Sequence, residues 1–223
     1  MTIFLKEAPP MNEYPDSVKQ NLCSIITLME KDPALFVKNP GKDFSRNRKL
    51  PFETVVKLLI SMGGNSIYKE LLESQGYNCD TVTASAFIQQ RDKILPYAFE
   101  FLLRSFTQTF RETKKYRGYR LLAVDGSDLL IARDPDDTDT YFQNQNEKGY
   151  NLLHLNAMYD LCNKLYIDAL IQPRRRMNEN KALVEMVDRS YIEENVIVVA
   201  DRGFESYNNF AHIENKGWNY LIR

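Results

Sequence analysis

The sequence has no apolar run near the roughly 20 residues that a membrane-spanning helix needs. Its N-terminus also lacks the basic stretch and apolar core of a signal peptide, so a cytoplasmic location is expected. A strong charge of either sign is missing as well, since 29 Lys and Arg residues face 30 Asp and Glu residues. The bulk charge therefore does not point to a nucleic-acid partner, and only local basic patches could provide one.

Cysteine is scarce. Cys23, Cys79 and Cys162 are far apart, odd in number and without a C-x-x-C pair, which excludes a disulfide framework and a thiolate zinc site. We expect reduced, mostly buried thiols. Apolar residues, in contrast, make up 43% of the 223 residues, enough for a packed core in one large domain or a domain with an appendage.

The spacing of apolar residues divides the chain into three parts. Residues 1–16 contain Pro9, Pro10 and Pro15 and are expected to form an irregular arm. Apolar spacings of three and four predict an all-helical region over 17–117. Solid or alternating apolar runs then predict strands over 118–223, in an α/β fold with a mixed five-stranded sheet and helices on its faces.

The predicted order of elements in the last part is strand, strand, strand, helix, strand, helix, strand. The segment YRLLAVDGSDLLIA (119–132) indicates a strand, a Gly-Ser turn and a second extended piece. Alternation over 151–173 indicates two strands joined by a tight turn. The remaining elements are expected as helices at 178–190 and 205–217 and strands at 195–201 and 218–223.

Two predicted strands end on an aspartate: VIVVA leads into Asp201, and LLAV leads into Asp125. Ligands of open α/β sheets bind at the carboxyl ends of strands, and neighbouring strands lie about 4.8 Å apart. Two carboxylates that close share a proton or bind a cation, and oxygen ligands favour Mg²⁺ or Mn²⁺. Asp128 is a rival for the role of Asp125, and each aspartate could equally be a turn residue or a helix cap.

The segments LLAVDGSDL and VIVVADRGFESYNNFAHIENKGWNYLIR resemble the first and second acidic motifs of DDE transposases, in the insertion-sequence-4 group of bacterial mobile elements. Residues 43–73 and 83–95 resemble the N-terminal region of that group. The resemblance implies an RNase H-like catalytic domain with its first strand beside its fourth. It also implies metal-dependent DNA cleavage and strand transfer at element ends, with Mg²⁺ or Mn²⁺ held by Asp125 and Asp201. A homodimer acting on double-stranded DNA in the bacterial cytoplasm is the assembly implied.

One feature of the family is missing from the sequence. The family's third carboxylate is a Glu within a Tyr-Arg-Glu-Lys signature, and the sequence ends at Arg223 without it. Glu185 and Glu205 lie outside any such signature and are expected to be surface residues. The chain is therefore expected to be a transposase truncated at the C-terminus. The alternatives are a catalytically inactive DNA-binding remnant that represses transposition, and a stand-alone nuclease.

Basic clusters predict where DNA would bind, although each could also be a solvated loop. They lie in TKKYRGYR (113–120), RRR (174–176) and RNRK (46–49). Helices at 52–62, 65–76 and 82–94 form either a helix-turn-helix-like trio or an ordinary bundle. Arg202 would contact DNA, orient Asp201 or form a surface salt bridge, and His154 is expected to be a satisfied strand histidine. The predicted DNA-binding residues are Arg202, Lys114, Lys115, Arg117, Arg174, Arg175, Arg176, Gln89, Gln90, Arg91 and Lys93.

Overall fold

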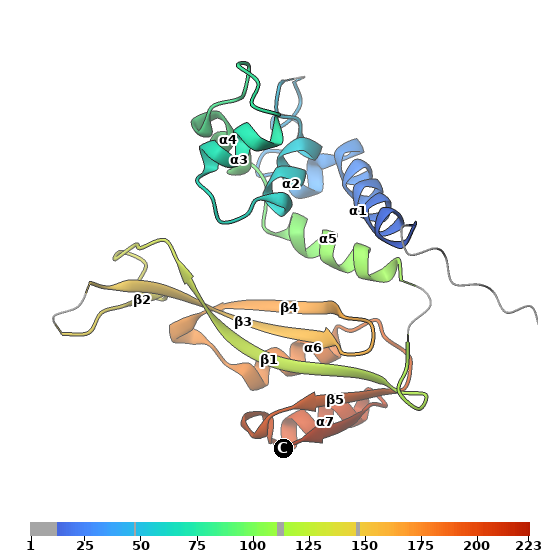
Figure 1. The fold of residues 1–223 in the computed structure, drawn as a ribbon. Helices are drawn as coiled ribbons and strands as arrows, with labels where there is room; N and C mark the ends of the chain where they lie inside the picture. Colours follow the sequence, from blue (N-terminus) through green and yellow to red (C-terminus); the bar gives the residue numbers. More distant parts are fainter. Residues whose placement is uncertain (1–12, 47, 111–113, 146–147) are drawn as a thin grey trace, which may run out of the picture. The chain divides into compact units, whose positions relative to one another are not determined.

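The computed structural model describes residues 13–46, 48–110, 114–145 and 148–223 (Figure 1). The chain divides into two compact units, Met1–Thr109 and Phe110–Arg223, which we call the first and the second unit. Within the described ranges, no helix has both the length and the apolar character needed to cross a bilayer.

The first unit is helical, as the apolar spacing predicts. Residues 1–12 of the expected arm lie outside the described residues, but 13–16 are helical, so the arm prediction is wrong there. Pro15 does not prevent this, because it lies in the first helical turn, where its missing N–H has no intrahelical partner. The elements of this unit are α1 (Glu13–Lys31), η1 (Pro33–Phe36), α2 (Phe52–Ser61), α3 (Ile67–Ser74), α4 (Ala84–Arg91) and α5 (Tyr97–Gln108).

The second unit is a mixed sheet with two helices. Its strands run in the order β2-β3-β1-β5-β6, and β4 also pairs with β3. β3 is antiparallel to β1 and β4, whereas β1, β5 and β6 are parallel to one another. The elements are β1 (Arg120–Ile131), β2 (Tyr141–Phe142), β3 (Tyr150–Asp160), β4 (Leu165–Pro173), α6 (Glu179–Asp188), β5 (Val196–Ala200), η3 (Arg202–Phe204), α7 (Tyr207–Asn215) and β6 (Asn219–Ile222).

This topology confirms the RNase H-like fold class, with two corrections. The sheet has six strands instead of five, because two residues of the loop after β1 pair with β3 as β2. The predicted Gly-Ser turn is also wrong, since β1 continues through it. Gly126 pairs with Asn156 and Ser127 pairs with Leu155, so the ladder with β3 supplies the hydrogen bonds that a turn would have lost.

Both helices of the second unit lie on one face of the sheet (Figure 1). Leu122, Val124 and Val198 from the strands form one buried cluster with Leu183 of α6 and Ile213 of α7. Because successive side chains of a strand point to opposite faces, the even-numbered residues of β1 face these helices. The odd-numbered residues face the other way, and this decides where each aspartate of β1 points.

The cysteines are unpaired, as expected, but the prediction that they are mostly buried is wrong. Cys79 is exposed, and Cys23 and Cys162 are partly buried. Cys79 lies in the connection after α3, and such connections run over the surface because their backbone groups need water.

A buried ion pair joins the beginning of β1 to the end of β3. Arg120 Nε donates a hydrogen bond of 2.5 Å to Asp160 Oδ2, and Asp160 has no exposed surface. The other oxygen, Asp160 Oδ1, accepts the backbone N–H groups of Cys162 and Asn163 in the β3–β4 turn. One carboxylate therefore holds the strand entry and the hairpin turn together.

Replacing Asp160 by Asn should lower the free energy of unfolding by about 3–5 kcal/mol, because it leaves the buried guanidinium of Arg120 without a counter-charge. Urea unfolding is the measurement. Asp188→Asn, in the exposed pair with His212, is the matched control and should cost less than about 1 kcal/mol. Similar losses for both variants would contradict a special role for the buried pair.

Candidate functional site

The parallel pairing of β1 with β5 brings Asp125 and Asp201 to the same level of the sheet. The paired positions end at Ala123 and Val199, and each aspartate lies two residues beyond this last pair. Asp201 directly follows β5 as expected, but Asp125 lies inside β1, because the ladder with β3 continues the strand to Ile131. Neighbouring strands lie about 4.8 Å apart, and matched positions on parallel strands point to the same face. Both side chains are exposed, on the face opposite α6 and α7. The convergence that the sequence predicts is therefore supported by the strand register.

One oxygen of each carboxylate is held by the backbone. Asp125 Oδ1 accepts the N–H of Gly126 at 2.8 Å, and Asp201 Oδ1 accepts the N–H of Gly203 at 2.8 Å. The second contact caps η3, so the turn after β5 orients Asp201. Across the described part of the chain, neither carboxylate forms an ion pair. Two adjacent carboxylates without a cationic partner form a site of concentrated negative charge.

These two carboxylates are a partial ligand set for a divalent metal. Among the described residues, no group of three or more His, Cys, Asp or Glu side chains is arranged to hold a metal ion. Mg²⁺ at phosphoryl-transfer sites is commonly held by one or two carboxylates together with water and substrate phosphates, so Asp125 and Asp201 fit that pattern. Glu185 does not extend the set, because it pairs with Arg189 of its own helix. Glu205 directly follows η3 as its C-cap and is exposed.

Asp128, the rival of Asp125, belongs to a different cluster on the other face. It lies three residues further along β1 and pairs across the ladder with His154 of β3. Asp128 Oδ1 lies 2.7 Å from His154 Nδ1, and Asp128 Oδ2 accepts a hydrogen bond of 2.8 Å from Arg174 Nε. The odd spacing between the two aspartates explains the difference, because it reverses the direction of the side chain.

His154 is a buried and satisfied strand histidine, as expected, with an exposed fraction of 4%. Its Nε2 lies 2.9 Å from Oε1 of Glu179, in the first turn of α6. Because carboxylates only accept hydrogen bonds, the two contacts require a proton on each ring nitrogen, or one on a carboxyl group. The hydrogen bond from His154, assisted by Arg174, holds the pKa of Asp128 below its ordinary value, and burial opposes this. The sequence did not single out Glu179, since nothing local to it indicates a partner on β3.

Gly126 has no side chain where the His154 cluster approaches β1. A Cβ at this position would lie 2.5 Å from both Glu179 Oε1 and His154 Nε2. Real side chains do not tolerate such distances, and His154 is buried and held by two partners. The segment next to Asp125 is therefore packed tightly against the N-terminus of α6.

The predicted basic residues of the second unit are largely engaged within the protein. Arg176 pairs with Asp139 at 2.8 Å, and Arg175 donates to the carbonyl of Tyr141. The guanidinium of Arg174 is bound by Asp128, as described above.

In the chain segment that leads into β1, the side chains of Lys115 and Arg117 have partners, whereas Lys114 is bonded through its backbone. Lys115 pairs with Glu194 at 3.2 Å, and the backbone N–H of Lys114 donates to Asn163. Arg117 lies over the ring of Tyr116. Arg202 begins η3 next to Asp201 and is exposed, so it is the predicted DNA contact nearest in sequence to the acidic pair.

In the first unit, α4 is shorter than the helix predicted over 82–94, because it ends at Arg91. Arg91 pairs with Asp92, and Lys93 lies beyond the helix end. Gln90 is 8% exposed and accepts a hydrogen bond from Lys93, so its amide oxygen already has a partner. Gln89 is exposed on the helix. A DNA contact for any of these residues remains a prediction.

Gly126→Ala should lower the free energy of unfolding by about 1–3 kcal/mol, because the new Cβ must displace Glu179 or His154. The measurement is urea unfolding at neutral pH. Ser127→Ala, at the adjacent exposed position of β1, is the control and should change stability by less than about 0.5 kcal/mol. Equal stability of Gly126→Ala and the parent protein would show that the cluster has room to relax.

Asp128→Asn should reduce stability at neutral pH, and the difference from the parent should narrow as the pH falls below about 4. The lowered pKa of Asp128 means that the folded state favours the carboxylate. This contribution is present above the pKa of the unfolded chain and is lost as the pH falls through the folded pKa. Unfolding curves at pH 7, 5 and 3 test this, with Asp136→Asn in an exposed loop as the control. A difference that stays constant with pH would contradict the assignment.

The chain is similar to known proteins in sequence and in structure. Residues 116–223 match the sequence model of the family described as Transposase DDE domain. No curated protein sequence matches the chain significantly. Three solved structures are similar, namely a piggyBac transposase synaptic complex with hairpin DNA, a Drosophila P element transposase strand transfer complex and a Mos1 transposase paired-end complex.

The similarity to these structures is distant. The identities are 13%, 11% and 14%, with TM-scores of 0.41, 0.36 and 0.31. The matches cover 95%, 93% and 98% of this chain and 48%, 47% and 69% of the respective proteins. The chain thus spans about half the length of the first two. The segment 116–223, which contains both acidic motifs, is thus similar in sequence to the transposase DDE domain family.

Proposed function

We propose that the chain acts on double-stranded DNA as a DDE transposase of the insertion-sequence-4-like group. The reaction is hydrolysis of a phosphodiester at an element end, followed by attack of the freed 3′-hydroxyl on target DNA. The observation that carries the proposal is the pair Asp125 and Asp201, two carboxylates without ion pairs among the described residues. They stand at matched levels of adjacent parallel strands, within the segment that matches the DDE domain.

In this proposal Asp125 and Asp201 hold Mg²⁺ or Mn²⁺ as two of its ligands. A bound divalent ion activates the attacking oxygen and stabilises the charge on the leaving oxygen in phosphoryl transfer. The protein keeps the two carboxylates oriented, because one oxygen of each is fixed by the N–H of Gly126 or Gly203. Both aspartates are exposed, on the sheet face opposite the two helices, where a DNA phosphate would have access.

The residue next to the acidic pair has a proposed role in binding DNA. Arg202 is exposed and directly follows Asp201, so its guanidinium can meet a phosphate beside the site. The basic residues before β1 and in the 174–176 segment would bind phosphates only by exchanging their present partners, such as Glu194 for Lys115. A homodimer on paired element ends is the assembly that the resemblance of the acidic motifs implies.

The test is Mn²⁺ binding by calorimetry, combined with Mn²⁺-dependent cleavage of duplex DNA, for the parent protein and for Asp125→Ala and Asp201→Ala. Each variant should abolish measurable Mn²⁺ binding. Loss of several kcal/mol of metal assistance should lower the cleavage rate by about a thousandfold or more. Asp136→Ala, a carboxylate removed from an exposed loop, is the matched control and should leave both unchanged.

The outcomes separate the proposal from its alternative. Mn²⁺ binding that survives both single substitutions would show that Asp125 and Asp201 do not form the metal site. DNA binding without metal binding or cleavage would favour a non-catalytic DNA-binding protein that occupies element ends and represses transposition.

A further inference from the structure

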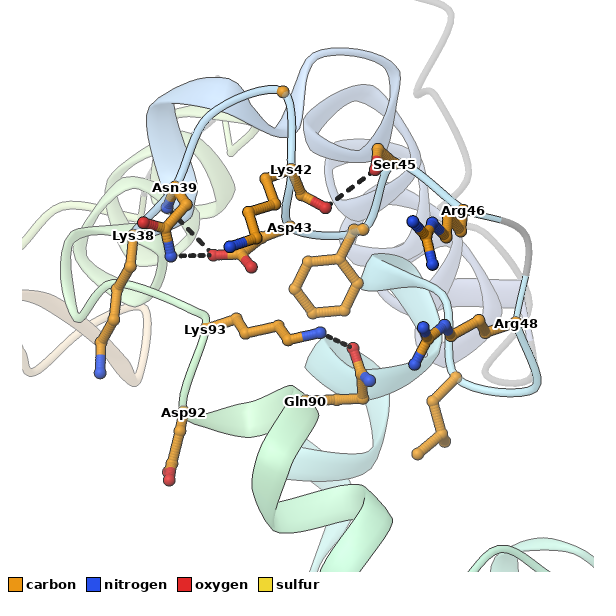
Figure 2. Close-up of a pocket in the computed structure, with 13 residues that line it drawn as sticks. Lys38, Asn39, Lys42, Asp43, Ser45, Arg46, Arg48, Gln90, Asp92 and Lys93 are labelled. Carbon is orange, nitrogen blue, oxygen red and sulfur yellow. Dashed lines mark hydrogen bonds between the residues drawn. The ribbon is translucent and has the colours of Figure 1, made fainter.

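The first unit contains a basic pocket of about 680 Å³, formed by described residues between Lys38 and Leu50, with residue 47 left out, and by residues around the end of α4 (Figure 2). We call it the 38–50 pocket. Arg46 and Arg48 lie on one side of it, and Lys93 reaches in from the other side to meet Gln90. The complete lining is Lys38, Asn39, Gly41, Lys42, Asp43, Phe44, Ser45, Arg46, Arg48, Leu50, Gln90, Asp92 and Lys93.

Positive charge exceeds negative charge in this lining, with five Lys and Arg side chains against two Asp side chains. Both carboxylates are already engaged. Asp43 Oδ2 accepts two hydrogen bonds of 3.0 Å from the backbone and side chain of Asn39, and Asp92 pairs with Arg91. The pocket therefore has cations that its own carboxylates do not neutralise.

Three exposed cations of the lining lie on the loop before α2, whereas the exposed Lys38 points away from them (Figure 2). Lys42, Arg46 and Arg48 are exposed, and none of them forms an ion pair with another described residue. The basic residues of the second unit differ, since Arg174 and Arg176 are both bound to aspartates. An anion can therefore enter the 38–50 pocket without displacing a protein carboxylate, which lowers the cost of binding.

The inner wall of the pocket is held by core packing. Lys93 Nζ donates to Gln90 Oε1 at 3.0 Å and lies 5.6 Å from the ring centre of Phe44. Phe44 adopts a φ of +56°, and its ring makes an edge-on contact with the buried Phe52. A large residue keeps such a left-handed backbone only where its surroundings determine it, so this packing supports the loop that carries the cations.

We propose that the 38–50 pocket binds the sugar–phosphate backbone of a DNA strand through Lys42, Arg46 and Arg48. The proposal rests on the proposed function, in which the chain acts on DNA. A cavity of this volume is much larger than one phosphate group, and Lys42, Arg46 and Arg48 can each neutralise a phosphate of a strand. The two amides in the lining already have partners, since Gln90 accepts from Lys93 and Asn39 donates to Asp43. Contacts to phosphates carry no sequence information, so we expect this pocket to bind duplexes of unrelated sequence equally.

The test is the salt dependence of duplex binding by the full chain, measured by fluorescence anisotropy in EDTA with two duplexes of unrelated sequence. Arg46→Gln with Arg48→Gln should weaken binding equally for both duplexes. The slope of log affinity against log salt should fall in magnitude by about 0.9 for each lost phosphate contact, hence by about 1.8 for the pair. Lys19→Gln with Lys31→Gln removes the same charge from exposed positions of α1 and should leave the slope nearly unchanged.

A second variant separates loss of charge from loss of folding. Arg46→Lys with Arg48→Lys retains both charges and should retain the parent slope. A smaller slope in this variant would point to a structural role of the arginines and overturn the proposal.

Equal slopes for the Gln pair and the parent would overturn the proposal while leaving the proposed function intact. A parent chain that fails to bind DNA would overturn both. Saturable binding of inorganic phosphate that the Gln pair abolishes, with unchanged DNA binding, would assign the pocket to a free anion and overturn the proposal.

Discussion

The parallel pairing of β1 with β5 is the constraint on which the site depends. It sets two apolar strands side by side in one register, so that Asp125 and Asp201 reach the same end of the sheet at the same level. Burial of Leu122 and Val198 against the two helices holds that register. A shift of one residue would exchange the buried and exposed faces of β5. The register that buries the hydrophobic core is therefore the same register that brings the two aspartates together.

The two faces of β1 carry different kinds of charged residue. The even-numbered face carries Gly126 and Asp128, which lie against His154 and Glu179 and tie the strand to β3 and to the N-terminus of α6. The odd-numbered face carries Asp125, which has no ion pair among the described residues and is exposed. Charges that stabilise the fold are thus paired and partly buried on one face. The charges proposed for chemistry stay unpaired on the other, as metal-binding carboxylates require.

The same distinction between engaged and available charge applies to the basic residues. The net charge does not reveal this distinction, because the 29 basic and 30 acidic residues of the chain almost cancel. In the second unit, most of the predicted DNA-binding cations have carboxylate, carbonyl or aromatic partners. In the first unit, the 38–50 pocket collects cations whose neighbouring carboxylates are occupied elsewhere. The partners of a basic cluster within the protein therefore decide whether it can bind DNA. The number of adjacent arginines in the sequence matters less.

The sequence by itself determined the fold class, the order of the helices and of all strands except the two-residue β2, and the two apolar runs that lead into Asp125 and Asp201. These follow from local periodicity and from apolar runs that stop at a polar residue. It did not determine that β1 runs through Gly126, because the ladder with β3 outweighs the local turn preference of Gly-Ser. Nor could it predict that His154 contacts both Asp128 and Glu179, since each partner lies about 25 residues away in the chain. It also could not predict that Gln90 lines a pocket with residues near position 40. Tertiary structure decided them, because hydrogen bonds and ion pairs form between groups that packing brings together.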